Sequence, residues 1–178
     1  RVRSFESRRA AEIATSLQRH GLVATVAPSM RELPLDENPA AFAFAEELTA
    51  GSIHVVVFMT GVGAQALKDA LETRGIASQF LSALERCTVV VRGPKPVAVL
   101  RAWGTRIDHR APEPNTWREL LSTLDAEVSL AGKRVAVQEY GIPNPDFYDA
   151  LAQRGDSVLS VPVYRWALPK DVGPLQDA

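Results

Sequence analysis

VVVFMTGVG, at residues 55–63, decides the fold, because an apolar strand there runs directly into a glycine-containing turn. Apolar residues at helical spacing follow at 66–71, so the turn leads into a helix. An apolar run followed by a turn returns at 88–95 and at 134–141. Parallel α/β sheets bind their ligands beyond the carboxyl ends of their strands. Three such turns predict a crevice lined with free backbone N–H groups, which favours a polyanionic ligand.

Composition restricts the partners of the chain. It has 178 residues, 46% of them hydrophobic and 23% charged, which is ordinary for a globular protein. Its net charge is -1, so no global positive field attracts nucleic acid or an anionic membrane, and anion binding must be local. The single cysteine, Cys87, adjoins an expected strand and is interpreted as a buried apolar thiol, which fits a reducing compartment. Without an apolar stretch of about 20 residues or a signal-peptide core at its start, the chain is predicted to be cytoplasmic.

The alternation of strand and helix patterns divides the chain into segments. Residues 1–27 have the pattern of a β-α-β unit, and residues 28–39 contain three prolines, which favours an extended connector. Residues 40–163 alternate regularly and predict one parallel-sheet domain. Residues 164–174, with two further prolines, are predicted to be irregular. The opening unit is too small to bury a core alone, so it either packs on the central block or belongs to a second domain completed by residues beyond 178.

Several motifs along the chain occur in the order of a known family. They are FMTGVG at 58–63, RGPKP at 92–96, APEPNTW at 111–117 and VPVYR at 161–165, preceded by Ser7-Arg8 at the start of the first helix. Together they resemble uroporphyrinogen-III synthase. The likeness covers nearly the whole chain and lies in the order and spacing of the motifs, since no single one is specific.

The resemblance implies an α/β fold of two flavodoxin-like or Rossmann-like parallel-sheet domains joined by a two-stranded linker. Residues 28–39 and 164–174 would be the linker, 40–163 the second domain, and 1–27 a portion of a first domain only partly present in this chain. The implied enzyme is a lyase of haem biosynthesis, which closes hydroxymethylbilane into uroporphyrinogen III with loss of water and inversion of ring D. The family needs no metal and no organic cofactor. Its linear tetrapyrrole substrate carries acetate and propionate groups, which agrees with a crevice of helix N-termini.

Tyr164 is the candidate catalytic residue, because it matches the tyrosine that the family has at the start of the second linker. A phenol there could donate a proton to the departing hydroxyl or shield an azafulvene-like cation. The structural alternative is a tyrosine at a strand end with its hydroxyl in water.

Candidate substrate-binding residues follow the strand ends. The hydroxyl of Thr60 and the N–H groups after it could hold a carboxylate, although a helix N-cap needs the same residues. Lys95 stands beside Pro96, where the family commonly has threonine, so a lysine charge would replace a hydroxyl contact unless Lys95 is only a surface residue. Arg8, near the first strand, could bind a carboxylate with its bidentate fork. The full set is Arg8, Thr60, Gly61, Val62, Gly93, Lys95, Asn115, Thr116, Tyr140 and Gly141.

Two of these helix starts also have a purely structural interpretation. The helix expected at 116–124 has Asn115 or Thr116 as its N-cap, and Glu119 in its first turn can reach back toward the cap. Tyr140-Gly141 with Asn144 forms a similar start. For both, capping and ligand binding are alternatives that the sequence leaves open.

Other kinds of site find no support in the sequence. His20, His54 and His109 lie on separate elements without carboxylates or cysteines at metal-ligand spacing, and so predict no metal site. No Walker loop is present, and the glycine turn at 61–63 lacks the third glycine of a dinucleotide fingerprint. Two alternatives to the enzyme stay open: a non-catalytic ligand-binding or regulatory domain of the same fold, and an unrelated flavodoxin-like domain. We expect a monomer that binds a small tetrapyrrole, without a nucleic-acid or membrane partner.

Overall fold

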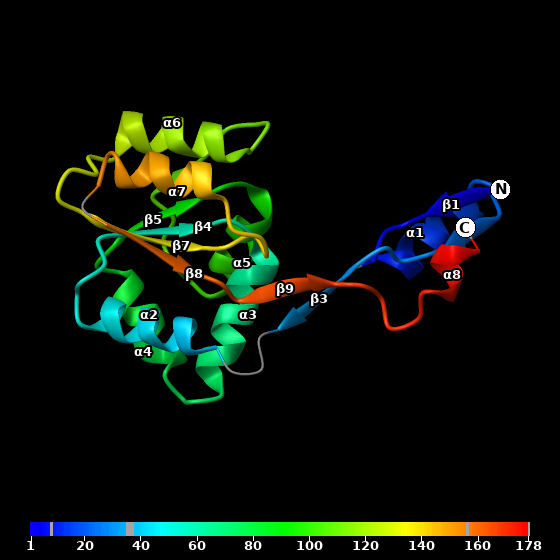
Figure 1. Cartoon of the computed structure of the whole chain (residues 1–178), viewed down its shortest axis with the longest axis horizontal. Helices are drawn as coiled ribbons and strands as arrows, with labels where there is room; N and C mark the ends of the chain where they lie inside the picture. Colours follow the sequence, from blue (N-terminus) through cyan, green and yellow to red (C-terminus); the bar gives the residue numbers. More distant parts are fainter. Residues whose placement is uncertain (8, 35–37, 156, 178) are drawn as a thin grey trace. The chain divides into compact units, whose positions relative to one another are not determined.

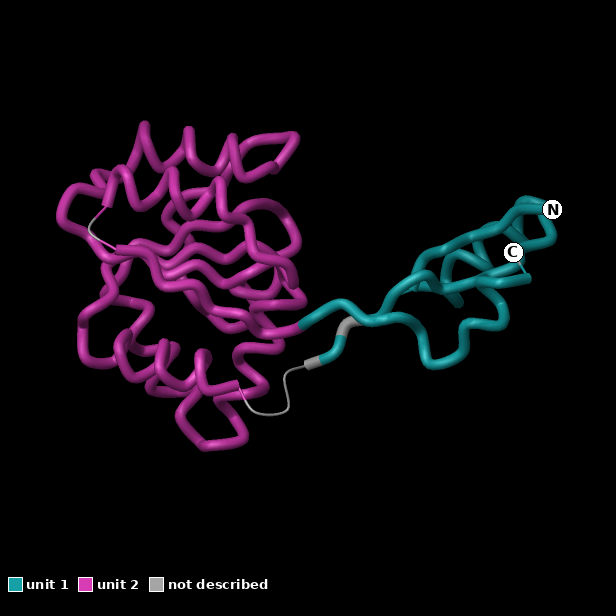
Figure 2. Tube along the Cα trace, in the orientation of Figure 1, with its two compact units in different colours: residues 1–33, 165–178 teal, residues 34–164 magenta. Residues whose placement is uncertain are grey.

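The computed structural model describes residues 1–7, 9–34, 38–155 and 157–177. They form two compact units, the first of residues 1–33 and 165–178 and the second of residues 34–164 (Figure 2). No helix among the described residues is long and apolar enough to cross a membrane.

A five-stranded parallel sheet forms the centre of the second unit. Its order is β6-β5-β4-β7-β8, and every neighbouring pair is parallel. The strands are β4 (Val55–Phe58), β5 (Thr88–Val91), β6 (His109–Arg110), β7 (Arg134–Gln138) and β8 (Ser157–Val161). This arrangement confirms the parallel α/β sheet predicted from the alternating patterns.

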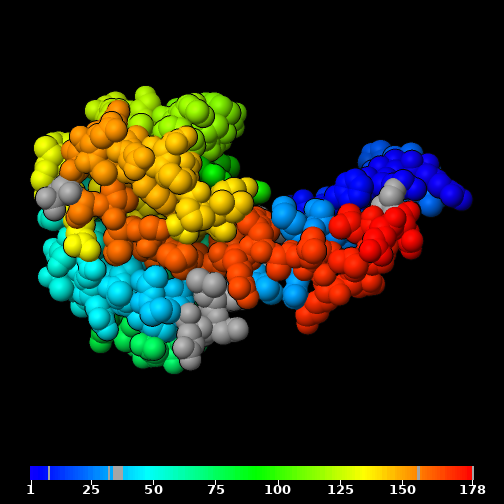
Figure 3. Space-filling model, viewed as in Figure 1, coloured from blue at the N-terminus to red at the C-terminus, as the bar shows by residue number. Residues whose placement is uncertain are grey.

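Helices cover both faces of this sheet (Figure 1). Four helices contact one another on one face: α2 (Pro39–Thr49), α3 (Gly61–Glu72), α4 (Ala77–Leu84) and α5 (Pro94–Ala102). The other face carries α6 (Trp117–Glu127) and α7 (Pro145–Ala152). Figure 3 shows α6 and α7 packed side by side at the surface of the unit.

The path of the chain through the sheet creates a topological switch point at its centre. From β4 the chain moves to β5 and β6 on one side, and it then returns to β7 on the other side. The connections after β4 and β7 lead to α3 and α7, which lie on opposite faces (Figure 1). Ligands of open α/β sheets bind at such a point, beyond the carboxyl ends of the two strands.

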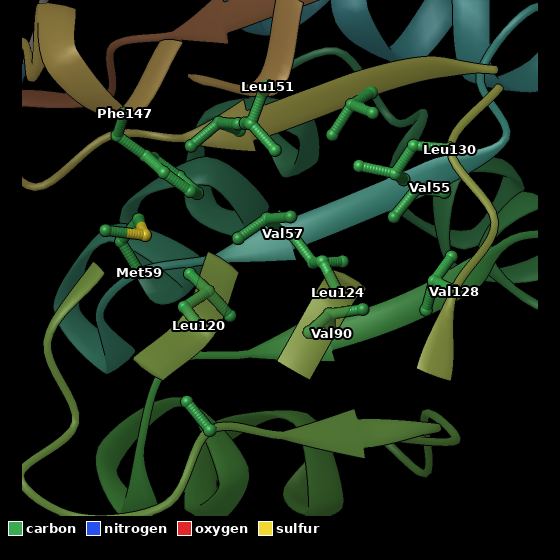
Figure 4. Packing of buried hydrophobic residues seen from close by; sticks show 13 residues of the cluster. Val55, Val57, Met59, Val90, Leu120, Leu124, Val128, Leu130, Phe147 and Leu151 are labelled. Carbon is green, nitrogen blue, oxygen red and sulfur yellow. The ribbon is translucent and has the colours of Figure 1, made fainter. Parts of the chain in front are cut away.

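The core of the second unit explains why these strand ends are held in place. All four residues of β4 are fully buried, because helices cover both faces of the strand. On the side of α6 and α7, apolar side chains of the strands and helices meet in one cluster (Figure 4). Val57, Leu124 and Phe147 belong to it, and each is 0% exposed. This packing fixes the strands whose carboxyl ends carry the candidate site.

The first unit is small and buries little apolar surface. β1 (Val2–Ser4) and β2 (Ala24–Val26) pair in parallel and are connected by α1 (Ala10–Arg19). The short helix α8 (Gly173–Gln176) also belongs to this unit. None of the residues of α1 is buried, and Val23 is 64% exposed. Within the described residues, this unit therefore has an apolar helix face without a complete core beneath it.

A second two-stranded sheet corrects the expectation for residues 164–174. β3 (Arg31–Pro34) pairs with β9 (Tyr164–Ala167), so the segment begins with a strand and is not irregular throughout. The side chain of Arg31 adds a hydrogen bond from Nε to the Leu168 carbonyl at 2.9 Å. The prolines at 162 and 169 flank β9 without interrupting it, and a strand distant in the sequence supplies its partner.

Candidate functional site

One buried amide joins the carboxyl ends of β4 and β7. Gln138, the last residue of β7, is 1% exposed, and its Oε1 accepts a hydrogen bond from the Thr60 N–H at 3.2 Å. Its Nε2 donates to the carbonyl of Glu139. A Cβ on Gly63 would overlap Gln138 Nε2 and lie 2.8 Å from Thr60 Oγ1. Gly63 is therefore required by packing at the switch point.

The start of α3 offers two free amides. Thr60 caps the helix through its Oγ1, which accepts from the Gly63 N–H at 2.9 Å. Within the described part of the chain, the N–H groups of Gly61 and Val62 have no hydrogen-bond acceptor. Because a helix N-terminus carries partial positive charge, these amides suit a carboxylate. The Thr60 hydroxyl accepts the cap bond and keeps its proton for a second partner.

The helices α3 and α5 approach each other closely at Gly61. A Cβ on Gly61 would lie only 2.7 Å from the carbonyl oxygen of Lys95. The absence of a side chain at Gly61 therefore serves helix packing, in addition to any contact with a ligand. The Lys95 side chain is exposed, whereas Pro96 beside it is buried. Lys95 thus follows β5 at the predicted edge of the sheet, with its side chain in solvent.

Asn115 ties the ends of β5 and β6 together. It has a positive φ of 60°, and its side-chain amide donates to the carbonyl oxygens of Arg92 at 3.1 Å and Ala111 at 3.2 Å. Gly93, the N-cap of α5, lies against it, since a Cβ on Gly93 would come within 3.1 Å of the Asn115 side chain. Both residues shape the edge of the sheet, and the amide hydrogens of Asn115 are used by the backbone.

Thr116 begins α6 with a reciprocal capping box, as the sequence predicts. Its Oγ1 accepts from the Arg118 N–H at 3.2 Å, and its own N–H donates to Glu119 Oε2 at 2.9 Å. The Thr116 hydroxyl also donates to this carboxylate and, together with the backbone bond, lowers the pKa of Glu119. The capping role of Thr116 is therefore confirmed.

Arg92, Tyr140 and Tyr164 gather at the same edge. Arg92 directly follows β5 and is partly buried, and its guanidinium carbon lies 4.7 Å from the centre of the Tyr140 ring. Burial lowers the pKa of Arg92, whereas the phenols of Tyr140 and Tyr164 raise it. Tyr164 is 3% exposed, so its ring is not in water.

A buried carboxylate lies beside this group. Glu139, 6% exposed, accepts hydrogen bonds from the Tyr148 hydroxyl at 3.0 Å and from Ser160 Oγ. Burial raises the pKa of Tyr148, and the neighbouring Glu139 adds to this shift. These bonds join β7, α7 and β8 beneath the turn of Tyr140 and Gly141, where Gly141 has a φ of 69°.

The sequence prediction missed Arg92, Gln138 and Glu139. Each stands at the end of a buried strand or directly after it, and a polar residue in that place is the signal that could have identified them. Arg8, which was predicted to bind substrate, lies outside the described residues. Among the residues that the structure describes, no three His, Cys, Asp or Glu side chains gather in a way that could hold a metal ion.

A cavity of about 560 Å³ lies at the opposite, amino edge of the sheet. In its lining, Arg106 Nε contacts Asp108 Oδ1 at 2.7 Å and Arg106 Nη2 donates to the Cys87 carbonyl at 2.9 Å. The Cys87 thiol is buried, as expected, and burial raises its pKa. Since parallel sheets bind ligands at the carboxyl ends of their strands, the candidate site is the edge that holds Arg92 and Tyr164.

Comparison with known proteins points to a single family. Residues 11–177 match the family described as uroporphyrinogen-III synthase HemD. The uncharacterized protein YjjA of Bacillus subtilis (strain 168) is 30% identical over 174 residues, which is 96% of this chain and 62% of that protein. The chain thus spans less than two thirds of the length of this relative.

Solved structures of Thermus thermophilus uroporphyrinogen III synthase have a similar fold. A mutant form of that enzyme matches with a TM-score of 0.75 at 22% identity, over 94% of this chain and 62% of that chain. Another structure matches with a TM-score of 0.60 at 24% identity, over 94% of this chain and 63% of that chain. At this identity the likeness establishes the α/β fold and leaves the chemistry to be argued from the site.

Proposed function

Because the chain belongs to the uroporphyrinogen-III synthase family, we propose that the protein closes hydroxymethylbilane into uroporphyrinogen III. The reaction loses water and inverts the last pyrrole ring, which makes the protein a lyase of tetrapyrrole biosynthesis. The chain spans 62% of the length of YjjA and of the mutant Thermus enzyme. We therefore propose the activity and the substrate of the family for this chain.

The observation that carries the proposal is the gathering of Tyr164 and free helix amides at one edge of the sheet. The N–H groups of Gly61 and Val62 offer hydrogen bonds to an acetate or propionate group of the bilane. Tyr164 is buried at the same edge, where a phenol can donate a proton in a site with little water. The edge therefore combines carboxylate binding with a proton donor.

In the proposed reaction, Tyr164 donates its proton to the hydroxyl that departs from the terminal methylene, and the hydroxyl leaves as water. The terminal methylene then bonds to the ring D carbon that already carries the bridging methylene of ring C, and the bond between that carbon and the bridging methylene breaks. The released bridging methylene bonds to the other α-carbon of ring D, which loses its proton, so ring D is inverted and one water is released in total. Exclusion of water around Tyr164 would protect the cationic intermediate from recapture by hydroxide or water. Positioning of the bilane by its carboxylates would then favour the inverted ring over simple closure.

A coupled assay on the full-length protein tests the proposal. Hydroxymethylbilane is generated in place, and the ratio of the uroporphyrin I and III isomers is read by chromatography after oxidation. We expect mainly isomer III from the wild type. Tyr164→Phe should lower the turnover by about 100-fold, the low end of general-acid contributions, with little change in thermal stability.

Tyr148→Phe is the matched control, because it also removes a partly buried phenolic hydroxyl but lies in the Glu139 network. It should leave the turnover per folded molecule near that of the wild type. A wild-type protein that is folded and yields only isomer I would refute the synthase and favour a ligand-binding or regulatory domain of the same fold. A Tyr164→Phe protein that loses stability but keeps its turnover would refute the catalytic role of Tyr164.

A further inference from the structure

The side chain of Arg92 reaches across the topological switch point. Arg92 follows β5 and Tyr140 follows β7, and β4 lies between these two strands. Adjacent strands are about 4.8 Å apart, so the ends of β5 and β7 are separated by about 10 Å. The guanidinium carbon lies 4.7 Å from the centre of the Tyr140 ring, so the side chain of Arg92 extends from the end of β5 toward the residues that follow β7. The strand between these two ends, β4, leads into α3, which begins with the free amides of Gly61 and Val62.

The backbone of Arg92 is held from both sides. Its N–H donates to the Phe58 carbonyl of β4 at 3.0 Å, and its carbonyl accepts from the Asn115 amide at 3.1 Å. The face of Tyr140 then orients the guanidinium by a cation–π contact. Because the cation is ordered before a ligand arrives, little side-chain freedom is lost on binding.

The charge of Arg92 has no anionic partner in the described part of the chain. The nearby carboxylate of Glu139 already accepts bonds from Tyr148 and Ser160. Arginines are rarely buried without an ion pair, and burial lowers the pKa of Arg92. The ion pairs in which both residues are described include Arg9–Glu12, Lys68–Glu72, Arg106–Asp108, Arg134–Glu47 and Arg154–Asp125.

We propose that Arg92 and the amides of Gly61 and Val62 together bind one carboxylate of the ligand, with Tyr140 holding the guanidinium in place. The planar guanidinium can donate to both oxygens of a carboxylate, while the amides approach the same group from the helix axis. The inference rests on the proposed function for the identity of the ligand, which is then an acetate or propionate group of a tetrapyrrole.

Titration of the full-length protein with uroporphyrin I, a fluorescent porphyrin that carries the same acetate and propionate groups, tests this site. A hydrogen bond to a charged group contributes about 1.5–3 kcal/mol, so Arg92→Gln should weaken binding by about 10- to 100-fold. Arg92→Gln should also make the affinity less dependent on salt concentration, because a charge that contacts the ligand is lost. If the role of Arg92 were purely structural, the salt dependence would stay unchanged. Arg92→Lys keeps the charge but lacks the planar guanidinium, so its affinity for uroporphyrin I should lie between that of the wild type and that of Arg92→Gln.

Arg74→Gln is the matched control. Its guanidinium also stacks on an aromatic ring, 3.5 Å from the centre of Phe42, but it follows the C-terminal end of α3, away from the carboxyl edge. We expect the affinity of Arg74→Gln for uroporphyrin I to equal that of the wild type.

Three results would overturn the inference: no binding of uroporphyrin I by the folded wild type, wild-type affinity and salt dependence in folded Arg92→Gln, or an equal loss in Arg74→Gln. If Arg92→Gln does not fold, Arg92→Lys is judged by the same criteria. The isomer assay separates this proposal from the synthase. If the protein yields only isomer I, the proposed synthase activity is refuted. If uroporphyrin I binding by the same protein still depends on Arg92, the carboxylate site is supported.

Discussion

Replacement of Gly61 by alanine tests how closely α3 and α5 pack at the candidate site. A Cβ on Gly61 would lie 2.7 Å from the Lys95 carbonyl oxygen and 3.2 Å from Val99 Cγ2. Ordinary contact begins at 3.4 Å, so the start of α5 has to move by about 0.7 Å. The carbonyl belongs to the backbone and cannot rotate away as a side chain can. The substitution therefore displaces the helix whose first turn follows Arg92 and Gly93.

The expected cost follows from two opposing effects. Overpacking costs about 1–3 kcal/mol, and the smaller conformational freedom of alanine in the unfolded chain offsets about 0.4–1 kcal/mol of it. From the midpoints of these two ranges, about 2 and about 0.7 kcal/mol, we expect Gly61→Ala to lower the free energy of unfolding by about 1.3 kcal/mol. Urea unfolding followed by circular dichroism measures it, and an unchanged m value would show that only stability has changed.

Val99→Ala provides the control for this prediction. It removes the contact with Val99 Cγ2 but leaves the Lys95 carbonyl in place, so it should relieve little of the overpacking. In a double-mutant cycle we expect a coupling energy below about 0.5 kcal/mol between the two changes. A Gly61→Ala protein as stable as the wild type would refute the close approach of α3 and α5.

Two further predictions concern α6. Leu124→Ala removes a fully buried side chain and should lower the free energy of unfolding by about 3–5 kcal/mol in urea, more than Leu121→Ala, which is only partly buried. Thr116→Ala removes an N-cap and should cost about 1 kcal/mol at neutral pH. Because the folded pKa of Glu119 lies below its ordinary value of 4.5, the stability from the capping box is present above that pH and is lost as the pH falls through the folded value. The difference between the wild type and Thr116→Ala should therefore narrow below pH 4.5, and a constant difference would contradict the role of the carboxylate.

The strand-turn-helix at 55–72 could be predicted from the sequence because every local signal agrees. The apolar run suits a buried strand, Thr60 suits a cap, and the glycines allow close helix packing. The strand β9 could not be predicted in the same way. Its partner β3 lies far away in the sequence, and prolines at 162 and 169 suggest an irregular segment when the pairing is unknown.

The candidate site was only partly predictable for a similar reason. The strand ends were identified, since each is marked by a turn that follows an apolar run. The importance of Arg92 depends on the order β5-β4-β7, which places its side chain across β4 and against Tyr140. No local pattern contains that order. Asn115 is predicted from the sequence to bind substrate, and its positive φ and its bonds to two carbonyls give it a further role in joining strands that only the packed sheet reveals.

The contrast between Arg92 and Lys95 shows why burial decides which cation matters. Both follow β5 and both carry one positive charge, but Lys95 is exposed, whereas Arg92 is partly buried and fixed through its backbone. An exposed ion pair contributes about 0–1 kcal/mol, because water screens it and a flexible side chain must be ordered. A hydrogen bond to a charged group away from water contributes about 1.5–3 kcal/mol. If a carboxylate binds at this edge, Arg92 should therefore contribute more to the affinity than Lys95 does. The geometry of the strand end is thus a better guide than the position of the lysine beside Pro96 in the sequence.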